Sequence, residues 1–136
     1  MNSSKTIFQK ILAKEIPAHI LYEDEEFFVL LDILPVNVGH CLLITKKPYT
    51  DIFSMEDDIL RKIMPYAKRL SLLLKEALNA DGVKFVQNNG AAAGQEVMHY
   101  HLHLIPGYNS EPKSLPKKTE LKELSKLLEP YFKRWN

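Results

Sequence analysis

Cysteine is almost absent from this sequence. Cys41 is the single cysteine among 136 residues, so the chain cannot form an internal disulfide, and its apolar neighbours predict a thiol buried in the core. The N-terminal residues also lack the apolar segment of a secretion signal. Both absences favour a reducing compartment, and we expect the protein to be cytoplasmic.

Charge of one sign and long hydrophobic runs are equally scarce. Lysine and arginine number 18 against 17 aspartate and glutamate residues, which leaves a net charge of +1. No basic block is present to neutralise a phosphate backbone, so no nucleic-acid partner is expected. No hydrophobic run approaches the ~20 residues that span a bilayer, so no membrane partner is expected either. Hydrophobic residues still make up 46% of the chain, which predicts one domain with a packed core.

Apolar periodicity and turn residues predict the order helix, three strands, helix, two strands, helix. The first helix should begin at Thr6, which can form a capping box with Gln9, and the long helix at Ser54, three residues before Asp57. Pro65 should kink or split the long helix. The expected helices cover residues 6–14, 54–79 and 119–134, and the expected strands cover residues 20–22, 27–31, 40–45, 83–86 and 99–105. Short turns between strands and grouped helices favour an α+β fold, a five-stranded antiparallel sheet with helices packed on it.

Three of the five histidines occupy alternate positions, at His99, His101 and His103. A period of two is the period of a strand, so the three imidazoles should project from one face while the apolar residues between them enter the core. Such a cluster can supply a neutral nucleophile, a proton carrier or metal ligands. Because His-x-His on a strand can bind one metal ion, a metal site is the main alternative to metal-free chemistry on phosphorus.

Other polar features are placed where they could reach these histidines. The loop of residues 88–94 is rich in alanine and glycine, and it either cradles a phosphate with its backbone amides or serves only as a flexible connection. Asp32 ends an apolar strand, where it can accept hydrogen bonds from ribose hydroxyls or cap a turn. His40 begins the next strand and should reach the cluster, whereas His19 should lie at the surface.

The histidine segment resembles the His-φ-His-φ-His-φ-φ signature of the histidine triad (HIT) superfamily, in which φ is an apolar residue. Further motifs fall where the Hint-like bacterial branch of this superfamily places them, and the resemblance extends from Thr6 to about Gly107. These motifs are Thr6-Ile7-Phe8-x-Lys10-Ile11, Glu15-Ile16-Pro17-Ala18, Tyr22-Glu23-Asp24, Leu31-Asp32-Ile33-x-Pro35, Gly39-His40, Asn88-x-Gly90 and Gly94-Gln95-x-Val97.

The resemblance implies a nucleotide hydrolase or transferase that acts on the α-phosphorus of purine nucleotides through a covalent nucleotidyl-histidine. It implies that His101 is the nucleophile and that His103 lies beside the phosphate. It places His99 and His40 in the network that orients the nucleophile, and it gives the ribose to Asp32. The implied base pocket comprises Ile7, Phe8, Ile11, Ile16, Leu30 and Ile33, and the implied surroundings of the phosphate and leaving group comprise Asn88, Gly94, Gln95 and Glu96.

The chain departs from the family pattern at several positions. Many bacterial relatives bind a structural zinc with two cysteines and two histidines, but three of these positions carry Thr6, Gln9 and Pro48 here, and only His99 is left. We therefore expect neither a metal nor another cofactor. Glu96 stands where some Hint-like enzymes have a hydroxyl residue, and the C-terminal segment differs from that of the animal enzymes.

The substrate consequently stays open among three possibilities. The first is a purine nucleoside phosphoramidate, hydrolysed to AMP; the second is a dinucleoside polyphosphate; the third is that the protein is a nucleotide-binding regulator with residual catalysis. The resemblance assigns residues 1–107 to the HIT domain, and residues 108–136 should add a tail and helix to the same domain. It also implies a homodimer in which residues 83–86 pair across a twofold axis, and the many apolar residues of the long helix agree with such an interface.

Overall fold

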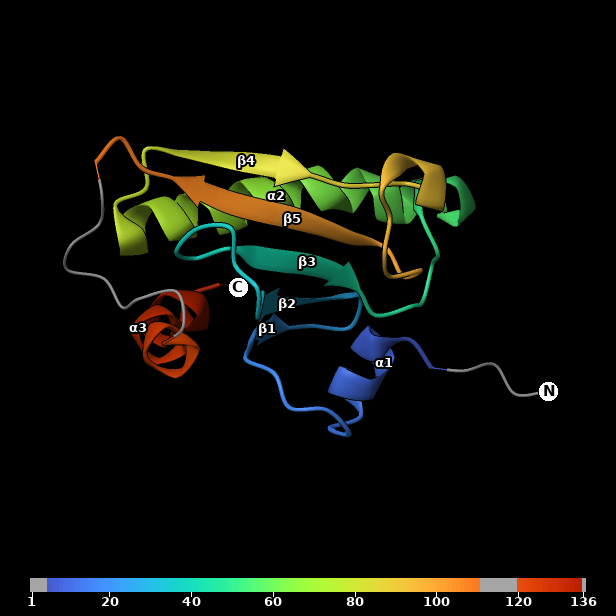
Figure 1. Cartoon of the computed structure of the whole chain (residues 1–136), viewed down its shortest axis with the longest axis horizontal. Helices are drawn as coiled ribbons and strands as arrows, with labels where there is room; N and C mark the ends of the chain where they lie inside the picture. The colour runs from blue at the N-terminus through green and yellow to red at the C-terminus, as the bar shows by residue number, and fades with distance from the viewer. Residues whose placement is uncertain (1–4, 111–119, 136) are drawn as a thin grey trace.

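The computed structural model describes residues 5–110 and 120–135, which form one sheet with helices on it (Figure 1). The α-helices are α1 (Ile7–Leu12), α2 (Asp57–Leu78) and α3 (Leu121–Lys133), and η1 (Ile52–Ser54) and η2 (Ala91–Ala93) are short 3₁₀ helices. The strands are β1 (Ile20–Glu23), β2 (Phe27–Leu31), β3 (Cys41–Thr45), β4 (Gly82–Val86) and β5 (His101–Gly107). The predicted order of helices and strands is confirmed.

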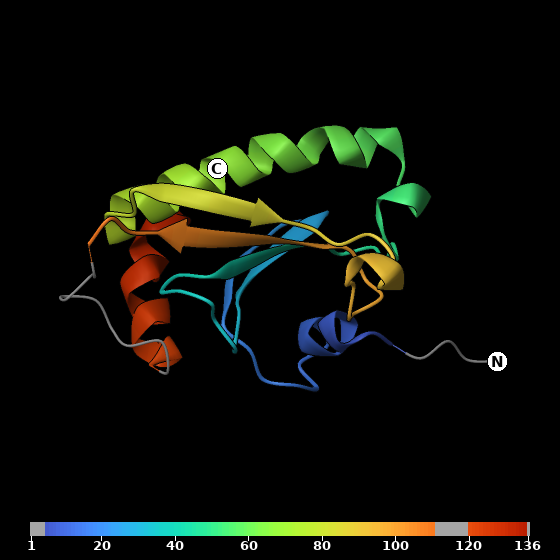
Figure 2. The ribbon, with the colours of Figure 1, turned by 45° about the horizontal axis from the view of Figure 1, so that its top comes forward.

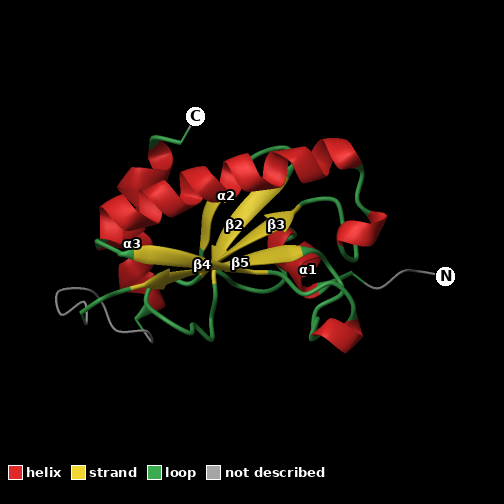
Figure 3. Cartoon of the chain, turned by 90° about the horizontal axis from the view of Figure 1, so that it is seen from above, coloured by secondary structure: helices red, strands yellow, loops and turns green. Residues whose placement is uncertain are grey.

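The five strands pair antiparallel in the order β1-β2-β3-β5-β4, as predicted for this α+β fold. β2 and β3 are buried along their whole length, Cys41 included, because both faces of the sheet are covered. Phe27 and Val29 pack into the core shared with α2 and α3, whereas Phe28 and Leu30 pack against α1. Figure 2 shows α2 and α1 on opposite sides of the sheet, and Figure 3 shows α2 running beside the fan of strands.

The capping box predicted for α1 is present, but the predicted start of α2 is wrong. α2 begins at Asp57 rather than at Ser54. The Ser54 hydroxyl donates to the Asp51 carbonyl at 3.2 Å, and the Asp51 side chain caps η1, so this segment forms a separate 3₁₀ turn. α2 then runs through Pro65 as one helix, so the split that was one of the two predicted effects of Pro65 is wrong, and the kink stays a prediction. The exposed position of Pro65 leaves its ring in solvent instead of in the core.

α3 folds back on its own chain. Leu124, Leu128 and Trp135 are buried in the core that also contains the inner face of α2. The leucine pattern of the C-terminal segment therefore predicted a real apolar face, whereas the predicted first residue, Thr119, lies outside the described residues. Among the helices that the structure describes, none is long and apolar enough to cross a membrane.

β4 forms one edge of the sheet and pairs with β5. Apolar side chains are exposed beside this edge: Phe85 of β4 is 40% exposed, and Met64 and Leu72 of α2 are 47% and 56% exposed. This edge of the molecule is therefore both apolar and open to a further strand.

Candidate active site

β5 presents two histidines to a cavity of about 400 Å³. His101 and His103 are half-buried on one face of the strand, and Leu102 between them is buried on the other. The register pairs His101 with Ile44 and His103 with Leu42. Because those two apolar residues belong to the cluster under α1, both imidazoles lie on the α1 side of the sheet.

His99 is placed differently from the other two triad members. β5 begins at His101, two residues later than predicted, because the Tyr100 amide donates to the Tyr49 carbonyl at 2.7 Å outside the sheet. His99 is fully buried and does not line the cavity. It nevertheless stays beside His101, since the Phe8 ring packs edge-on against both imidazoles, with centroid distances of 5.3 Å and 5.0 Å.

A backbone carbonyl determines which nitrogen of His101 carries the proton. Nδ1 of His101 lies 2.8 Å from the carbonyl oxygen of His99. A carbonyl oxygen can only accept a hydrogen bond, so Nδ1 must donate. In the neutral ring the lone pair is then on Nε2, which makes this nitrogen available as a nucleophile or a base.

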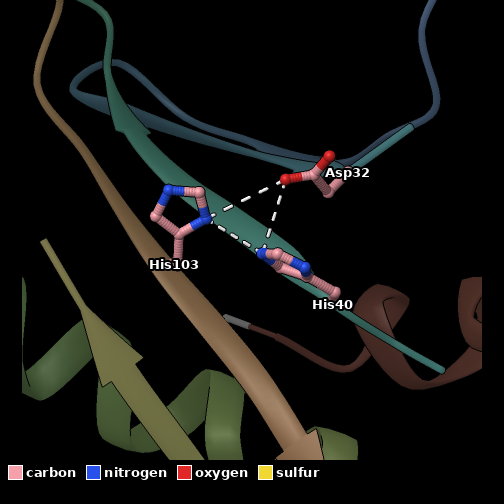
Figure 4. A group of neighbouring side chains, drawn as sticks. All are labelled: Asp32, His40 and His103. Carbon is pink, nitrogen blue, oxygen red and sulfur yellow. Dashed lines mark hydrogen bonds and ion pairs between the residues drawn. The ribbon is translucent and has the colours of Figure 1, made fainter. Parts of the chain in front are cut away.

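One hydrogen bond and two ion-pair contacts join His40, His103 and Asp32 (Figure 4). The Val36 amide donates to Nδ1 of His40 at 3.0 Å, so a neutral His40 has its proton on Nε2. That nitrogen lies 2.9 Å from Nδ1 of His103 and 3.4 Å from Oδ2 of Asp32. Nδ1 of His103 therefore accepts, and the proton of the neutral His103 ring is on Nε2.

Asp32 forms the turn cap that was one of its two predicted roles, and its predicted contact with ribose stays a prediction. Its Oδ1 accepts a hydrogen bond from the Leu34 amide at 2.9 Å, which is the turn cap. Its Oδ2 faces the histidine pair, 3.4 Å from His40 and 3.9 Å from His103. The carboxylate thus stands at the cavity wall with one oxygen in the turn and the other against the imidazoles.

Asp32, His40 and His103 are also the group of described residues that could hold a metal ion. Their donor atoms all lie within 4.8 Å of one another. The separation of 2.9 Å between Nε2 of His40 and Nδ1 of His103 is, however, shorter than the roughly 3.3 Å between two nitrogens bound to one tetrahedral ion at ordinary bond lengths. The donor set fits a hydrogen-bonded network better than a coordination shell.

His99 is tied to the N-terminal helix by its side chain. Its Nε2 lies 2.7 Å from the Thr45 carbonyl oxygen, and its Nδ1 lies 2.6 Å from the Thr6 hydroxyl. Thr6 stands at a position for which the resemblance implies a zinc ligand in relatives, and here a direct hydrogen bond joins it to His99. The sequence analysis did not predict this hydrogen bond, because a pair 93 residues apart leaves no local pattern. The available signal was the resemblance, which groups positions 6 and 99 in the zinc site of relatives.

Burial keeps the triad imidazoles neutral. It lowers the pKa of His99, His101 and His103 below the ordinary value for histidine. For His103, burial and then the neighbouring His101 and His40 lower the pKa to about 4, against the opposing effect of Asp32. At neutral pH the three rings are therefore uncharged, which is the form in which His101 can attack an electrophile.

The loop before β5 is braced by Gln95 and is not a loose connection. The buried Gln95 side chain accepts from the Gly90 amide at 2.7 Å and donates to the carbonyls of Thr50 and Val97 at 2.6 Å and 3.0 Å. Gln95 lines the cavity, but its amide group is engaged with the loop backbone. Gly94 has a φ of +96°, which only glycine adopts without strain, so this loop shape depends on it.

The structure gathers the predicted site residues, His99 excepted, in one cavity wall. They are Ile7, Phe8, Ile11, Ile16, Leu30, Asp32, Ile33, His40, Asn88, Gly94, Gln95, Glu96, His101 and His103. The sequence analysis missed Pro17, Ala18, Leu31, Leu34, Val36, Leu42 and Val97. Pro17 and Ala18 directly follow Ile16 in a recognised motif, and that proximity was the available signal.

The chain is similar to known proteins over most of its length. The HIT domain model matches residues 13–110. An uncharacterized HIT-like protein of Methanocaldococcus jannaschii is 46% identical over 105 residues, which cover 77% of this chain and 81% of that protein. The adenosine 5′-monophosphoramidase of Saccharomyces cerevisiae is 42% identical over 100 residues, which cover 74% of this chain and 61% of that protein. A crystal structure of a zinc-bound histidine triad family protein from Mycobacterium smegmatis has a TM-score of 0.84 at 32% identity and covers 95% of this chain and 94% of that one. The chain therefore belongs to the HIT domain family.

Proposed function

We propose that this protein is a nucleotide hydrolase that releases AMP from purine nucleoside 5′-phosphoramidates through a covalent intermediate on His101. The observation that carries the proposal is the hydrogen bond of 2.8 Å from Nδ1 of His101 to the His99 carbonyl, which leaves Nε2 unprotonated beside the cavity. Membership of the HIT domain family and the likeness to the yeast adenosine 5′-monophosphoramidase support it.

In the proposed first step, Nε2 of His101 attacks the α-phosphorus and the phosphorus–nitrogen bond of the substrate breaks. The departing nitrogen keeps the bonding pair and takes up one proton from water, so it leaves as an amine. The imidazole becomes a cation whose Nδ1 proton is still held by the His99 carbonyl, which stabilises the charge as it forms. In the second step water attacks phosphorus, the histidine–phosphorus bond breaks, AMP leaves and one proton returns to solvent.

His103 is proposed to donate from Nε2 to a phosphate oxygen. Its Nδ1 accepts from His40, and that contact fixes the proton on the opposite nitrogen. A donor held in place before the reaction stabilises the charge that develops on the equatorial oxygens without reorganisation. His40 and Asp32 then act as the groups that orient His103, and Asp32 is in addition the proposed acceptor for the ribose hydroxyls.

The apolar end of the cavity is proposed to bind the purine. The side chains of Ile7, Phe8, Ile11 and Leu30 come from α1 and β2 and enclose this end. Such a surface binds a flat base by contact area and removes it from water. The size of the cavity, about 400 Å³, lies within the range of small-molecule sites.

The charges around the cavity favour an amine leaving group over a nucleotide. Asp32 and Glu96 line it, and none of the described lining residues is a lysine or an arginine. A dinucleoside polyphosphate would bring several negative charges to a wall that bears carboxylates. A phosphoramidate brings one negative charge at phosphorus and a leaving amine that can itself be cationic, so its charges match the wall better.

The proposal is tested by trapping the intermediate. The protein is incubated with an adenosine phosphoramidate, denatured rapidly, and analysed by intact-mass spectrometry for one adenylyl group, which peptide mapping should locate on His101. His101→Ala should form no adduct and lose several orders of magnitude in kcat, as expected when a covalent nucleophile is removed, while calorimetry should find AMP binding largely unchanged. Treatment with EDTA should leave wild-type activity intact.

His19→Ala is the matched control, because His19 does not line the cavity. It should react like the wild type. Near-normal turnover in His101→Ala would refute the nucleophile. A wild-type protein that binds AMP but forms no adduct and turns over neither substrate class would instead identify a nucleotide-binding regulator.

A further inference from the structure

The partly buried contact between Thr6 and His99 has no part in the scheme above. Thr6 is the N-cap residue of α1. Its hydroxyl lies 2.6 Å from Nδ1 of His99, a residue 93 positions further along the chain. We propose that Thr6 is a positioning residue, which acts through His99 to hold His101 in the tautomer that leaves Nε2 unprotonated. The kinetic consequence rests on the proposed function, whereas the tautomer itself does not.

The direction of each hydrogen bond around Thr6 follows from the donors available. Nε2 of His99 faces the Thr45 carbonyl at 2.7 Å and must donate to it, so Nδ1 of the neutral ring can only accept. The Thr6 hydroxyl therefore donates to Nδ1, and it accepts from the Gln9 amide at 3.2 Å. One hydroxyl thus caps α1 and fixes the His99 ring at the same time.

The His99 ring matters because its own carbonyl is the acceptor for His101. β5 begins at His101, so the sheet does not hold the peptide group between residues 99 and 100. This peptide is fixed at its amide end, where Tyr100 donates to Tyr49 at 2.7 Å, and through the His99 side chain, which is bonded at both ring nitrogens. Loss of the Thr6 hydroxyl leaves the buried Nδ1 of His99 without its donor. We expect the backbone of residue 99 to shift as its side chain moves toward a new partner, and this shift weakens the hydrogen bond between Nδ1 of His101 and the His99 carbonyl.

The Thr6 hydroxyl also affects the positions of His99 and His101 through α1. The Phe8 ring packs edge-on against His99 and His101, and the capping box at Thr6 holds the helix that carries Phe8. The capping box has a second half that does not involve His99, since Gln9 Oε1 accepts from the Thr6 amide at 2.9 Å. Removing only that half weakens α1 and leaves the bond between Thr6 and His99 in place.

This division gives a matched set of variants. Thr6→Val keeps the shape of the side chain and removes the hydroxyl, Thr6→Ser keeps the hydroxyl, and Gln9→Ala loosens α1 alone. The first readout is nitrogen-15 NMR of histidine-labelled protein without substrate, which identifies the protonated nitrogen of each ring. Wild type, Thr6→Ser and Gln9→Ala should show His101 protonated on Nδ1, and Thr6→Val should show a mixture of tautomers.

The second readout is steady-state kinetics with the adenosine phosphoramidate. Thr6→Val should lower kcat by about 10- to 100-fold relative to Gln9→Ala, the scale of a misoriented reacting group, with little change in KM relative to the same control. Thr6→Ser should restore kcat. Should Thr6→Val fail to fold by circular dichroism, Thr6→Ala makes the same comparison.

The outcomes separate the two proposals. An unchanged His101 tautomer in a folded Thr6→Val or Thr6→Ala protein, with kcat equal to that of Gln9→Ala, refutes the positioning role. A wild-type protein that does not hydrolyse the phosphoramidate refutes the proposed function, and in that case the NMR comparison alone still decides whether Thr6 holds His101.

Discussion

Three imidazoles of this site are held by backbone groups at defined ring nitrogens. The Val36 amide bonds Nδ1 of His40. The His99 carbonyl bonds Nδ1 of His101, and the Thr45 carbonyl bonds Nε2 of His99. A backbone group cannot change its role from donor to acceptor, so each contact dictates a tautomer. At the residue scale, the site is therefore a set of neutral rings whose lone pairs and protons have assigned directions.

The neutral state of His103 should make folding stability depend on pH. In the unfolded chain a histidine titrates near pH 6.5, and in the folded protein burial lowers the pKa of His103 to about 4. Between these values the unfolded state binds more protons, so stability is complete above about pH 6.5 and falls as the pH drops toward 4. Urea unfolding should show a loss on the order of 2–3 kcal/mol over this interval.

His103→Gln removes this ring and should make that pH profile shallower, while His99 and His101, whose pKa values burial also lowers, keep their contributions. His19→Gln, which changes a histidine remote from the cavity, should leave the profile as it is. Equal slopes in His103→Gln and wild type between pH 6.5 and 4 would contradict the assignment of the effect to His103.

Glu96 should select the leaving group by charge. Glu96→Gln is expected to raise kcat/KM for a dinucleoside polyphosphate relative to an amine conjugate by about 3- to 10-fold, because an exposed charge acts on a neighbour with roughly 1 kcal/mol. The change should shrink at high salt, which screens exposed charges. Glu25→Gln makes the same charge change at an exposed residue outside the cavity wall and serves as the control; an identical shift in both variants would assign the effect to net charge instead.

At the scale of elements, α3 is anchored by Trp135, which follows the end of the helix by two residues. Trp135 is 4% exposed; it stacks on Tyr22 of β1 with a centroid distance of 4.4 Å and lies under the Arg69 guanidinium of α2 at 5.1 Å. A single side chain thus joins a helix, a strand and the C-terminal segment. That the C-terminal helix belongs to the same domain as the residues before it stays a prediction.

Trp135→Ala should lower the free energy of unfolding by about 3 kcal/mol, because it removes a large buried ring and leaves a cavity. Since Trp135 lies on the side of the sheet away from α1, KM should stay unchanged. Urea unfolding measures the first quantity and steady-state kinetics the second. Lys133→Ala, at an exposed position of the same helix, should change stability little; equal stability of Trp135→Ala and Lys133→Ala would show that α3 is not anchored in this way.

Local patterns in the sequence predicted the elements better than the contacts between them. The alternation around His101 and the capping box at Thr6 each depend on a few neighbouring residues, and both are present in the structure. The start of α2 was predicted wrongly because Ser54 belongs to the 3₁₀ turn that Asp51 caps. A small polar residue can cap an α-helix or stand in such a turn, and the sequence alone does not distinguish these two positions. The bond between Thr6 and His99 exists only after the sheet has formed, so no window of sequence contains it.

For the whole molecule, the edge at β4 is the natural place for a second copy of the chain. We propose a homodimer in which β4 pairs with its symmetry mate and continues the sheet. An edge strand leaves backbone groups unpaired, and the exposed side chains of Met64, Leu72 and Phe85 add apolar surface on the same side. A cavity of about 480 Å³ between α2 and β4 would be filled by a partner. It is lined by these three residues together with Lys68, Ser71, Lys75, Gly82 and Val83.

Light scattering at micromolar concentration should give about twice the chain mass of 15.7 kDa. The double variant Leu72→Lys with Phe85→Lys should give a single chain mass, because four introduced lysines would join the native Lys68 and Lys75 of both copies at a twofold interface. Phe53→Lys alters an apolar side chain that is 78% exposed elsewhere and should leave the dimer intact. A wild-type protein that scatters as one chain at these concentrations would disprove the assembly.

The alternation along β5 has a practical consequence for anyone who prepares this protein. Histidines face the cavity, and Leu102 and Leu104 face the core, so a slip of one residue would bury the imidazoles and expose the leucines. A misregistered molecule would therefore lose its solubility and its active site together. If His101 is the nucleophile, titration with a slowly turned-over adenylylating substrate counts correctly folded molecules one by one, and the adduct becomes a calibration standard for every refolded or engineered batch.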